Sequence, residues 1–233
     1  MNRVRKWWDD VRSGWRDAFA EDTFKKAFWF NFLLSVIVYM LIVQWLKLNS
    51  TRVGTIVNDP VYGFLDPRDF SSYIFFFTYT GAIITLLYLA QYPRLLHRGL
   101  TAFAALFVVR AICIFLIPLS PSGDMVRLHD PFTNFMANEE SINNDLFFSG
   151  HVADMAFFCF IVGNPWLKRI LFICTVSVAV LLVWQRVHYT FDVVAAPVFA
   201  YFCYWAFVEK DIIWSPFLKK SPASKNSHSP VAE

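Results

Sequence analysis

The sequence contains few charged residues, and its few cysteines are not positioned to form disulfide bonds. Charged residues make up only 17% of the 233 residues, against about 25% in average soluble domains. The net charge of +3 is small and the basic residues are dispersed, which argues against a nucleic-acid partner. A disulfide scaffold or a zinc site would need cysteines paired near loops at ligand spacing. Instead all four lie inside apolar runs, so we interpret them as small buried hydrophobes: Cys113, Cys159, Cys174 and Cys203.

What the chain has in excess is apolar sequence, with 57% hydrophobic and 19% aromatic residues. A helix that crosses a bilayer needs about 20 largely apolar residues. Six runs approach this length, and the short alternating segments of barrel strands are missing. The predicted spans are Ala27–Leu46, Ser71–Tyr92, Gly99–Leu119, Leu146–Leu167, Ile170–Val187 and Tyr189–Val208. The predicted fold class is therefore all-α, a polytopic membrane protein whose six transmembrane helices form one bundle.

The distribution of Lys and Arg predicts the orientation of the spans. Basic residues are frequent in an N-terminal arm, residues 1–26, and in a polar tail, residues 209–233, but sparse in the loops 47–70 and 120–145. We therefore expect both termini in the cytoplasm and both sparse loops on the exoplasmic side. The domain plan is a cytoplasmic arm, a membrane domain over residues 27–208, and a cytoplasmic tail that we expect to be largely disordered.

The N-terminal arm has an amphipathic pattern. Val4, Trp8, Val11, Trp15 and Phe19 follow helical spacing, with charged residues between them. A helix of this kind suits the headgroup layer of a membrane. A groove on a cytosolic partner is the alternative use, and the position just ahead of a span favours the membrane surface.

Two polar motifs stand at the edges of apolar runs, where ionisable groups are costly to keep. The first is His188-Tyr-Thr-Phe-Asp192. If one helix includes both ends, the two side chains share a face. A carboxylate on one imidazole nitrogen fixes the tautomer, and the other nitrogen is then a nucleophile. Alone, this spacing is also typical of a structural hydrogen bond at a helix end.

The second motif is Ser149-Gly150-His151, at the start of the fourth predicted span. Glycine lets a headgroup approach the backbone closely. A serine and the free N–H groups of a helix start can bind phosphate oxygens. The histidine can protonate a leaving alkoxide and later deprotonate an acceptor hydroxyl. A lone histidine here would be structural more often than not, but together the motifs favour a site for phosphoryl chemistry on a lipid.

Arg110 is a charged residue inside the third predicted span. An arginine at such depth must face protein or water. It could pair with Asp154, which lies one turn beyond His151, or it could contact a phosphate. The sequence leaves both uses open.

These residues resemble a known superfamily. Asp145-Leu-Phe-Phe-Ser149-Gly150-His151 and His188-Tyr-Thr-Phe-Asp192 look like the third and fourth motifs of the sphingomyelin synthase family, a branch of the type 2 phosphatidic acid phosphatase (PAP2) superfamily. Arg110, followed by Pro118-Leu-Ser-Pro121, looks like a looser second motif. The resemblance implies a PAP2-like bundle and spans about 109–204.

The resemblance also implies roles. His188 would attack the phosphodiester of a glycerophospholipid, Asp192 would orient it, and His151 would protonate the departing diacylglycerol. A ceramide or another lipid alcohol would then take the headgroup from the phosphohistidine. No metal or cofactor is required. The implied substrate-binding residues are Ser149, Gly150, Asp145, Arg110, Arg186 and Tyr189.

The positions at which this sequence departs from the superfamily pattern distinguish between the possible functions. The lipid phosphatases of the superfamily carry a Lys-x6-Arg-Pro phosphate clamp and an arginine six residues before the last histidine. Position 182 here is Leu, and the clamp is missing. The sequence therefore favours a headgroup transferase, with a lipid phosphatase or phospholipase C-like hydrolase as the alternative. A channel or transporter is disfavoured, because transporters place their polar groups near the bilayer midplane.

Overall fold

The computed structural model describes residues 3–49, 52–129 and 146–216. Within these ranges the regular structure is helical. The described part of the chain forms seven α-helices: α1 (Arg3–Phe19), α2 (Asp22–Asn49), α3 (Ser71–Leu89), α4 (Pro93–Leu116), α6 (Gly150–Ile161), α7 (Pro165–Trp184) and α8 (Thr190–Tyr204). A short 3-10 helix, η1 (Pro60–Phe64), lies between α2 and α3, and a π-helix, η2 (Trp205–Glu209), continues α8. The predicted all-α fold class is confirmed for the described residues.

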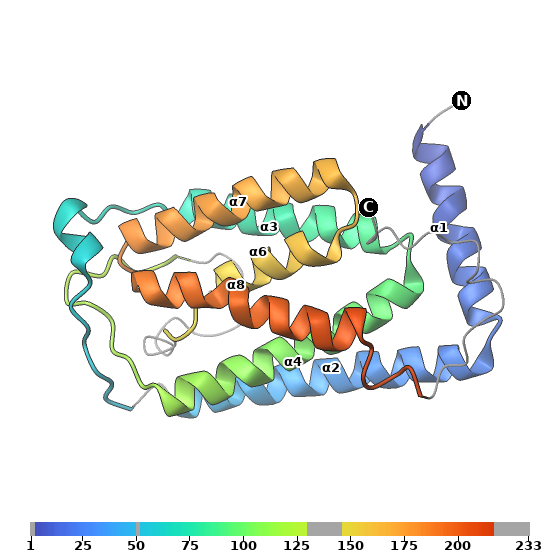
Figure 1. The fold of residues 1–233 in the computed structure, drawn as a ribbon, viewed down its shortest axis with the longest axis horizontal. Helices are drawn as coiled ribbons and strands as arrows, with labels where there is room; N and C mark the ends of the chain where they lie inside the picture. Colours follow the sequence, from blue (N-terminus) through green and yellow to red (C-terminus); the bar gives the residue numbers. More distant parts are fainter. Residues whose placement is uncertain (1–2, 50–51, 130–145, 217–233) are drawn as a thin grey trace.

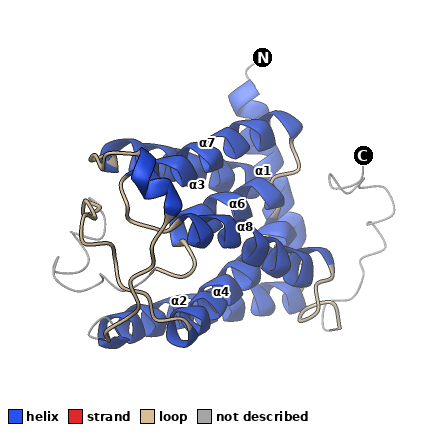
Figure 2. Ribbon diagram, turned by 60° about the vertical axis from the view of Figure 1, so that its left-hand side comes forward, coloured by secondary structure: helices blue, strands red, loops and turns tan. Residues whose placement is uncertain are grey.

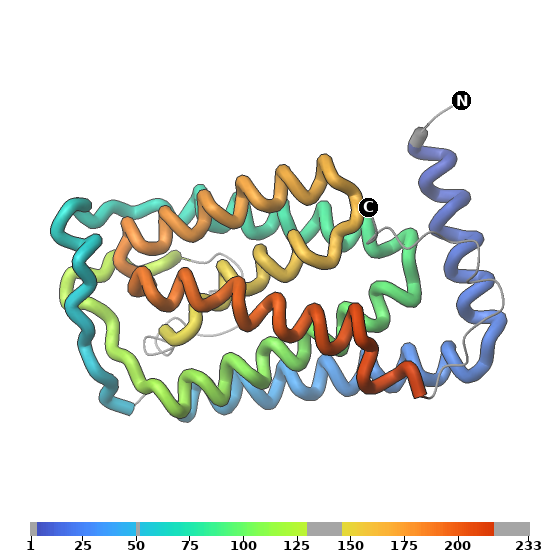
Figure 3. The backbone as a smooth tube through the Cα atoms, in the orientation of Figure 1, coloured from blue at the N-terminus to red at the C-terminus, as the bar shows by residue number. Residues whose placement is uncertain are grey.

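The helices from α2 to α8 run side by side along the long axis of the molecule, and α1 crosses one end of them (Figure 1). Residues 52–70, residues 117–129 and the α7–α8 turn gather at one end, which we call the histidine end. The α3–α4 and α6–α7 connections lie at the opposite end, close to α1 and to the end of α8 (Figure 3). Turning the molecule shows the loops of the histidine end together on one side (Figure 2).

Among the described residues, five helices are long and apolar enough to cross a membrane: α2, α3, α4, α7, and α8 together with η2. Their outer faces carry many exposed large apolar side chains, among them Leu33, Met40, Ile83 and Phe172. A soluble surface rarely exposes so much apolar area, whereas lipid tails cover it without cost. These five helices correspond to five of the six predicted spans.

The fourth predicted span, Leu146–Leu167, was too long. Its helix, α6, has 12 residues, or about 18 Å at 1.5 Å per residue, against a hydrocarbon core of about 30 Å. Asn164 ends the apolar run by capping α7, because its side chain accepts hydrogen bonds from the N–H groups of Trp166 and Leu167. Six full-length spans are therefore not confirmed, and α6 is a short helix inside the bundle.

The core is built around α6, which packs against α3, α4, α7 and α8. Val152 and Met155 of α6 are buried together with Leu171 of α7 and Ala196 of α8. Close packing against α3 depends on Gly81, because a Cβ there would lie 2.7 Å from the Met155 Cε atom. Small residues at such contacts are typical of helices that pack inside a membrane.

The second half of α1 packs on the bundle. Trp15 contacts the rings of Phe19 and Phe28, and its indole N–H donates to the carbonyl oxygen of Ala90 across 2.9 Å. The first half stays outside this contact, with Val4 66% and Trp8 52% exposed. Binding of the arm to a membrane surface therefore stays a prediction for its first half only.

Candidate active site

The turn between α7 and α8 holds the first predicted motif. Helix α7 ends at Trp184, and Arg186 has a positive φ of 60°, which reverses the chain. His188 follows in the turn, and α8 begins at Thr190. His188 therefore precedes the helix, so the condition that one helix includes both His188 and Asp192 is not met.

The histidine and the aspartate nevertheless face one another. The Nδ1 atom of His188 lies 3.6 Å from the Oδ2 atom of Asp192, and both side chains are buried. Asp192 Oδ2 also accepts a hydrogen bond from the N–H of Tyr189 across 3.1 Å. Among the described residues, His188 Nδ1 and Asp192 Oδ1 have no hydrogen-bond partner. A small closure of this distance would give Nδ1–H the carboxylate as acceptor and leave Nε2 for attack on phosphorus.

The second motif meets the first at the start of α6. The backbone N–H of Ser149 donates to the backbone oxygen of Asp192 across 3.3 Å. Ser149 is fully buried, and its hydroxyl has no hydrogen-bond partner in the described part of the chain. The two motifs, separated in sequence, are thus joined directly in the fold.

Gly150 is the residue that lets Arg110 approach the start of α6. A Cβ at position 150 would lie 3.0 Å from Arg110 Cζ and 3.1 Å from its Nε. The buried guanidinium also donates through Nε to the carbonyl oxygen of Phe148 across 2.9 Å. Arg110 acts electrostatically on Asp154 as well. The arginine therefore lies beside the motif that carries His151, and both uses considered for it, ion pair and phosphate contact, stay available.

His151 is in the first turn of α6 and is half-buried. Its ring packs edge-on against Phe75 of α3, with the centroids 5.6 Å apart. It is two residues from Ser149, which touches the backbone of Asp192. Asp145, the remaining residue of this motif, lies outside the described residues.

Two further predicted substrate-binding residues, Arg186 and Tyr189, are engaged by other parts of the protein. The guanidinium of Arg186 binds Asp124 Oδ2 at 2.7 Å and the carbonyl oxygens of Tyr62 and Leu65 at 2.8 and 3.1 Å. Tyr189 is fully buried, and its hydroxyl donates to the carbonyl oxygen of Ser120 across 2.8 Å. In this arrangement both side chains fasten loops of the histidine end to the α7–α8 turn.

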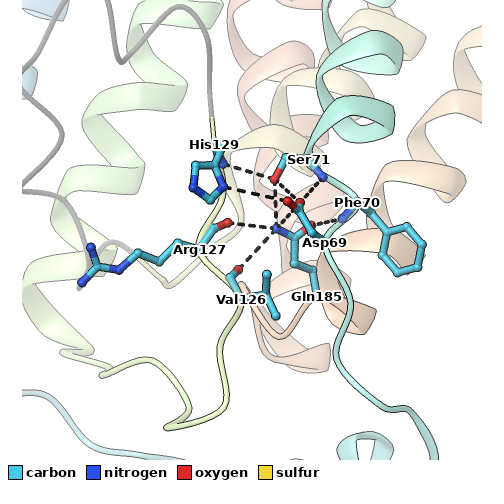
Figure 4. A network of polar contacts seen from close by, with 7 residues as sticks. All are labelled: Asp69, Phe70, Ser71, Val126, Arg127, His129 and Gln185. Atoms are coloured by element: carbon cyan, nitrogen blue, oxygen red, sulfur yellow. Dashed lines mark hydrogen bonds and ion pairs between the residues drawn. The ribbon is translucent and has the colours of Figure 1, made fainter.

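Sequence reasoning missed Gln185, the polar hub that precedes this turn. Figure 4 shows its fully buried amide between the start of α3 and residues 126–127. Oε1 accepts from the N–H of Phe70 across 2.8 Å, while Nε2 lies 3.1 Å from Ser71 Oγ and 3.2 Å from the oxygen of Arg127. Hydrogen bonds from the Ser71 hydroxyl and N–H lower the pKa of the neighbouring Asp69. A glutamine at the end of an apolar run carries no sequence signal for such a role.

Asp59 and Tyr62 are also residues of the histidine end that the sequence did not single out. The Asp59 carboxylate accepts from Thr190, and the Tyr62 hydroxyl donates to the backbone oxygen of His188. Burial raises the pKa of the Tyr62 phenol, and the negative charge of Asp59 raises it further. The hydroxyl therefore stays protonated and remains a hydrogen-bond donor. These contacts join residues more than a hundred positions apart, which no local pattern reveals.

Comparison with known proteins finds a match to a family model over part of the chain. Residues 144–209 match the family model described as PAP2 superfamily C-terminal. The match begins just before Ser149 and ends after α8, so it includes His151, His188 and Asp192. A search of curated proteins gave no match to this chain. The match supports the PAP2 superfamily expected from the motifs, and it does not single out the sphingomyelin synthase branch.

Proposed function

We propose that this protein is an integral-membrane enzyme that transfers a phosphorylated headgroup from a glycerophospholipid to a lipid hydroxyl. The hydrogen bond from Ser149 to Asp192 is the observation that carries the proposal, because it unites the two motifs that supply the histidines and the carboxylate. The match of residues 144–209 to the PAP2 superfamily, which covers both motifs, supports chemistry at a lipid phosphoester.

In the first step the Nε2 atom of His188 attacks phosphorus, and the bond between phosphorus and the diacylglycerol oxygen breaks. His151 gives its proton to the departing alkoxide, so that diacylglycerol leaves as a neutral alcohol. Asp192 closes the 3.6 Å that separates it from Nδ1, holds the imidazole tautomer and stabilises the charge that develops on the ring. The product of this step is a phosphohistidine that retains the headgroup.

In the second step the hydroxyl oxygen of a ceramide-like acceptor attacks phosphorus. His151, now neutral, takes the hydroxyl proton, the phosphorus–nitrogen bond breaks, and His188 is restored. The candidate contacts for the phosphate oxygens are the Ser149 hydroxyl, which is buried and lacks a hydrogen-bond partner among the described residues, and the Arg110 guanidinium beside Gly150. Charged hydrogen bonds of this kind stabilise a transition state most effectively where water is excluded.

Hydrolysis is the second candidate function, because PAP2 superfamily members include lipid phosphatases and water could replace the lipid hydroxyl in the second step. The resemblance places an arginine of the phosphatases at position 182. Here Leu182 is fully buried in the apolar core, where an arginine could not be accommodated without a partner. This difference favours transfer over hydrolysis.

The experiment is an assay of the purified protein in lipid nanodiscs with headgroup-labelled phosphatidylcholine, phosphatidylethanolamine or phosphatidylinositol, each with and without ceramide. We expect label in a new phospholipid only when ceramide is present. Label released as a water-soluble phosphoester, independent of ceramide, would instead establish the hydrolase. A suitable control is His129→Ala, since this histidine is also at the histidine end but is exposed and outside both motifs.

A further inference from the structure

Residues 52–70, the connection between α2 and α3, hold the α7–α8 turn from outside the bundle. Asp59 is the main contact. Its Oδ2 atom accepts from the N–H of Thr190 across 2.6 Å, and its Oδ1 atom accepts from the Thr190 hydroxyl across 3.1 Å. Oδ1 also accepts from the N–H of Val61 across 3.0 Å. The carboxylate is buried, so these hydrogen bonds are shielded from water.

Tyr62 holds the residue on the other side of the turn. Its hydroxyl donates to the backbone oxygen of His188 across 3.1 Å, and its ring stacks on that of Tyr189 with centroids 5.8 Å apart. Tyr62 therefore binds the backbone of the proposed nucleophile itself, and Asp59 binds the backbone two residues later. Neither residue contacts the imidazole ring in any of these interactions.

Asp59 and Asp192 both accept hydrogen bonds from backbone N–H groups at the start of α8. The first N–H groups of a helix have no partner within the helix and need acceptors from elsewhere. Asp192 accepts from Tyr189, and Asp59 accepts from Thr190. The acceptors of two successive backbone N–H groups therefore come from two different segments of the chain.

Because Asp59 accepts from Thr190, the Asp192 carboxylate does not have to serve that residue and can face His188. Without Asp59, the N–H and hydroxyl of Thr190 would lose their buried acceptor, which is unfavourable for groups that water does not reach. Asp192, which already accepts from Tyr189 in the same turn, would then compete to serve them, and a rotation of its carboxylate toward Thr190 would move Oδ2 away from the imidazole. The start of α8 would also lose the anchor that sets the position of its first turn.

We propose that Asp59 is a positioning residue for the phosphoryl transfer, which acts by capping α8 so that Asp192 stays aligned with His188. This inference rests on the proposed function and adds to it a residue from outside both motifs. It assigns to residues 52–70 a role in setting the active-site geometry as well as closing the histidine end.

The kinetic test compares Asp59→Ala and Asp59→Asn with Asp66→Asn, a matched change at an exposed aspartate of the same segment. Rates are given per folded molecule, after size-exclusion chromatography. We expect Asp59→Ala to lower kcat at least tenfold with KM within about twofold of wild type. Asp59→Asn should lose less, because its amide oxygen still accepts one hydrogen bond, and Asp66→Asn should be unchanged. A kcat for Asp59→Ala within twofold of wild type would overturn the proposal.

Amide hydrogen exchange tests the capping step without relying on activity. Peptides that cover residues 186–193 should exchange faster in Asp59→Ala, while peptides from the middle of α7 should not change. Unaltered exchange over 186–193 would overturn the proposal even if activity fell. If Asp59→Ala does not fold, Thr190→Val and Thr190→Ser replace it, because only the first removes the hydroxyl that binds Asp59. Faster exchange in Thr190→Val alone would then be the expected result, and equal exchange in both would overturn the proposal.

The two experiments distinguish a failure of this inference from a failure of the proposed function on which it rests. If wild type forms no product from any donor, the proposed function fails, and the positioning role fails with it. Hydrogen exchange would then report only whether Asp59 caps α8. If wild type is active and Asp59→Ala keeps its kcat, the proposed function stands and only the role of Asp59 is lost.

Discussion

The backbone N–H of Ser149 donates a hydrogen bond to the backbone oxygen of Asp192, with 3.3 Å between nitrogen and oxygen. This contact fixes the start of α6 against the first turn of α8. Ser149 lies two positions before His151, and Asp192 lies four positions after His188. The contact therefore brings the two separate motifs together through the backbone.

The nucleophile and its partner give the first prediction. His188→Ala should keep less than about a tenth of the wild-type rate, a loss of more than about 1.4 kcal/mol of transition-state stabilisation. Asp192→Asn should also remove most of the activity, although its amide oxygen can still accept from Tyr189. Because both side chains are buried, thermal unfolding should be measured beside activity, with His188→Gln as the variant closer in volume. More than a tenth of the rate in a folded His188→Ala would exclude the histidine as nucleophile.

Gly150 gives the second prediction. In a helix an alanine is normally favoured over glycine by about 1 kcal/mol. Here the added Cβ would lie 3.0–3.3 Å from three atoms of the Arg110 guanidinium group and displace it. Gly150→Ala should therefore lower kcat/KM about tenfold. Gly63→Ala is the matched control, because a Cβ at that position meets nothing within 4 Å. Equal activity in both variants would show that the position of Arg110 does not matter.

Gln185 gives a prediction about stability. Gln185→Leu would keep much of the side-chain volume but leave the partly buried N–H of Phe70 without its acceptor. Each such unsatisfied group costs about 1–3 kcal/mol. We expect a clearly lower Tm in detergent than for wild type. The control is Gln91→Leu, since this glutamine lies near the opposite end and is not buried. An unchanged Tm for Gln185→Leu would contradict the role of the hub.

Orientation in the membrane gives another prediction, because it was inferred from the distribution of charge alone. A cysteine at Ser122, in the loop after α4, should react with an impermeant thiol reagent added outside intact cells. A cysteine at Lys26, near the start of α2, should not react until the cells are opened. The native cysteines are buried or half-buried in the helices, which keeps the background low. The reverse pattern would place the histidine end in the cytoplasm.

The sequence predicted what depends on local pattern. Apolar runs located the long helices, and the last two predicted spans, Ile170–Val187 and Tyr189–Val208, left only His188 between them, where the structure has the turn from α7 to α8. The same reasoning failed at Asn164. Hydropathy is averaged over a window of residues, so it does not detect a single polar residue whose side chain caps a new helix. Asp59 and Gln185 were missed for another reason. Their partners are 131 and 115 residues away in the chain, and only the packed fold brings them together.

The proposed roles of the two histidines predict different failures. With a nitrophenyl phosphodiester donor, the leaving group needs little protonation, so His151→Ala should still form the phosphohistidine slowly. His188→Ala should form none with any donor. Transfer to a lipid alcohol should stay impaired in His151→Ala, because the acceptor still needs a base. Equal loss of the intermediate in both variants with this donor would contradict the assignment.

The most direct measurement is to trap the covalent intermediate in the wild-type protein. The enzyme in nanodiscs is mixed with a phospholipid labelled in its phosphate, quenched within milliseconds under alkaline conditions that preserve phosphohistidine, digested, and analysed by mass spectrometry. The account predicts label on His188, accumulating when no acceptor is present and disappearing when ceramide is added. Label on His151, or product formation with no labelled protein at any time, would contradict it.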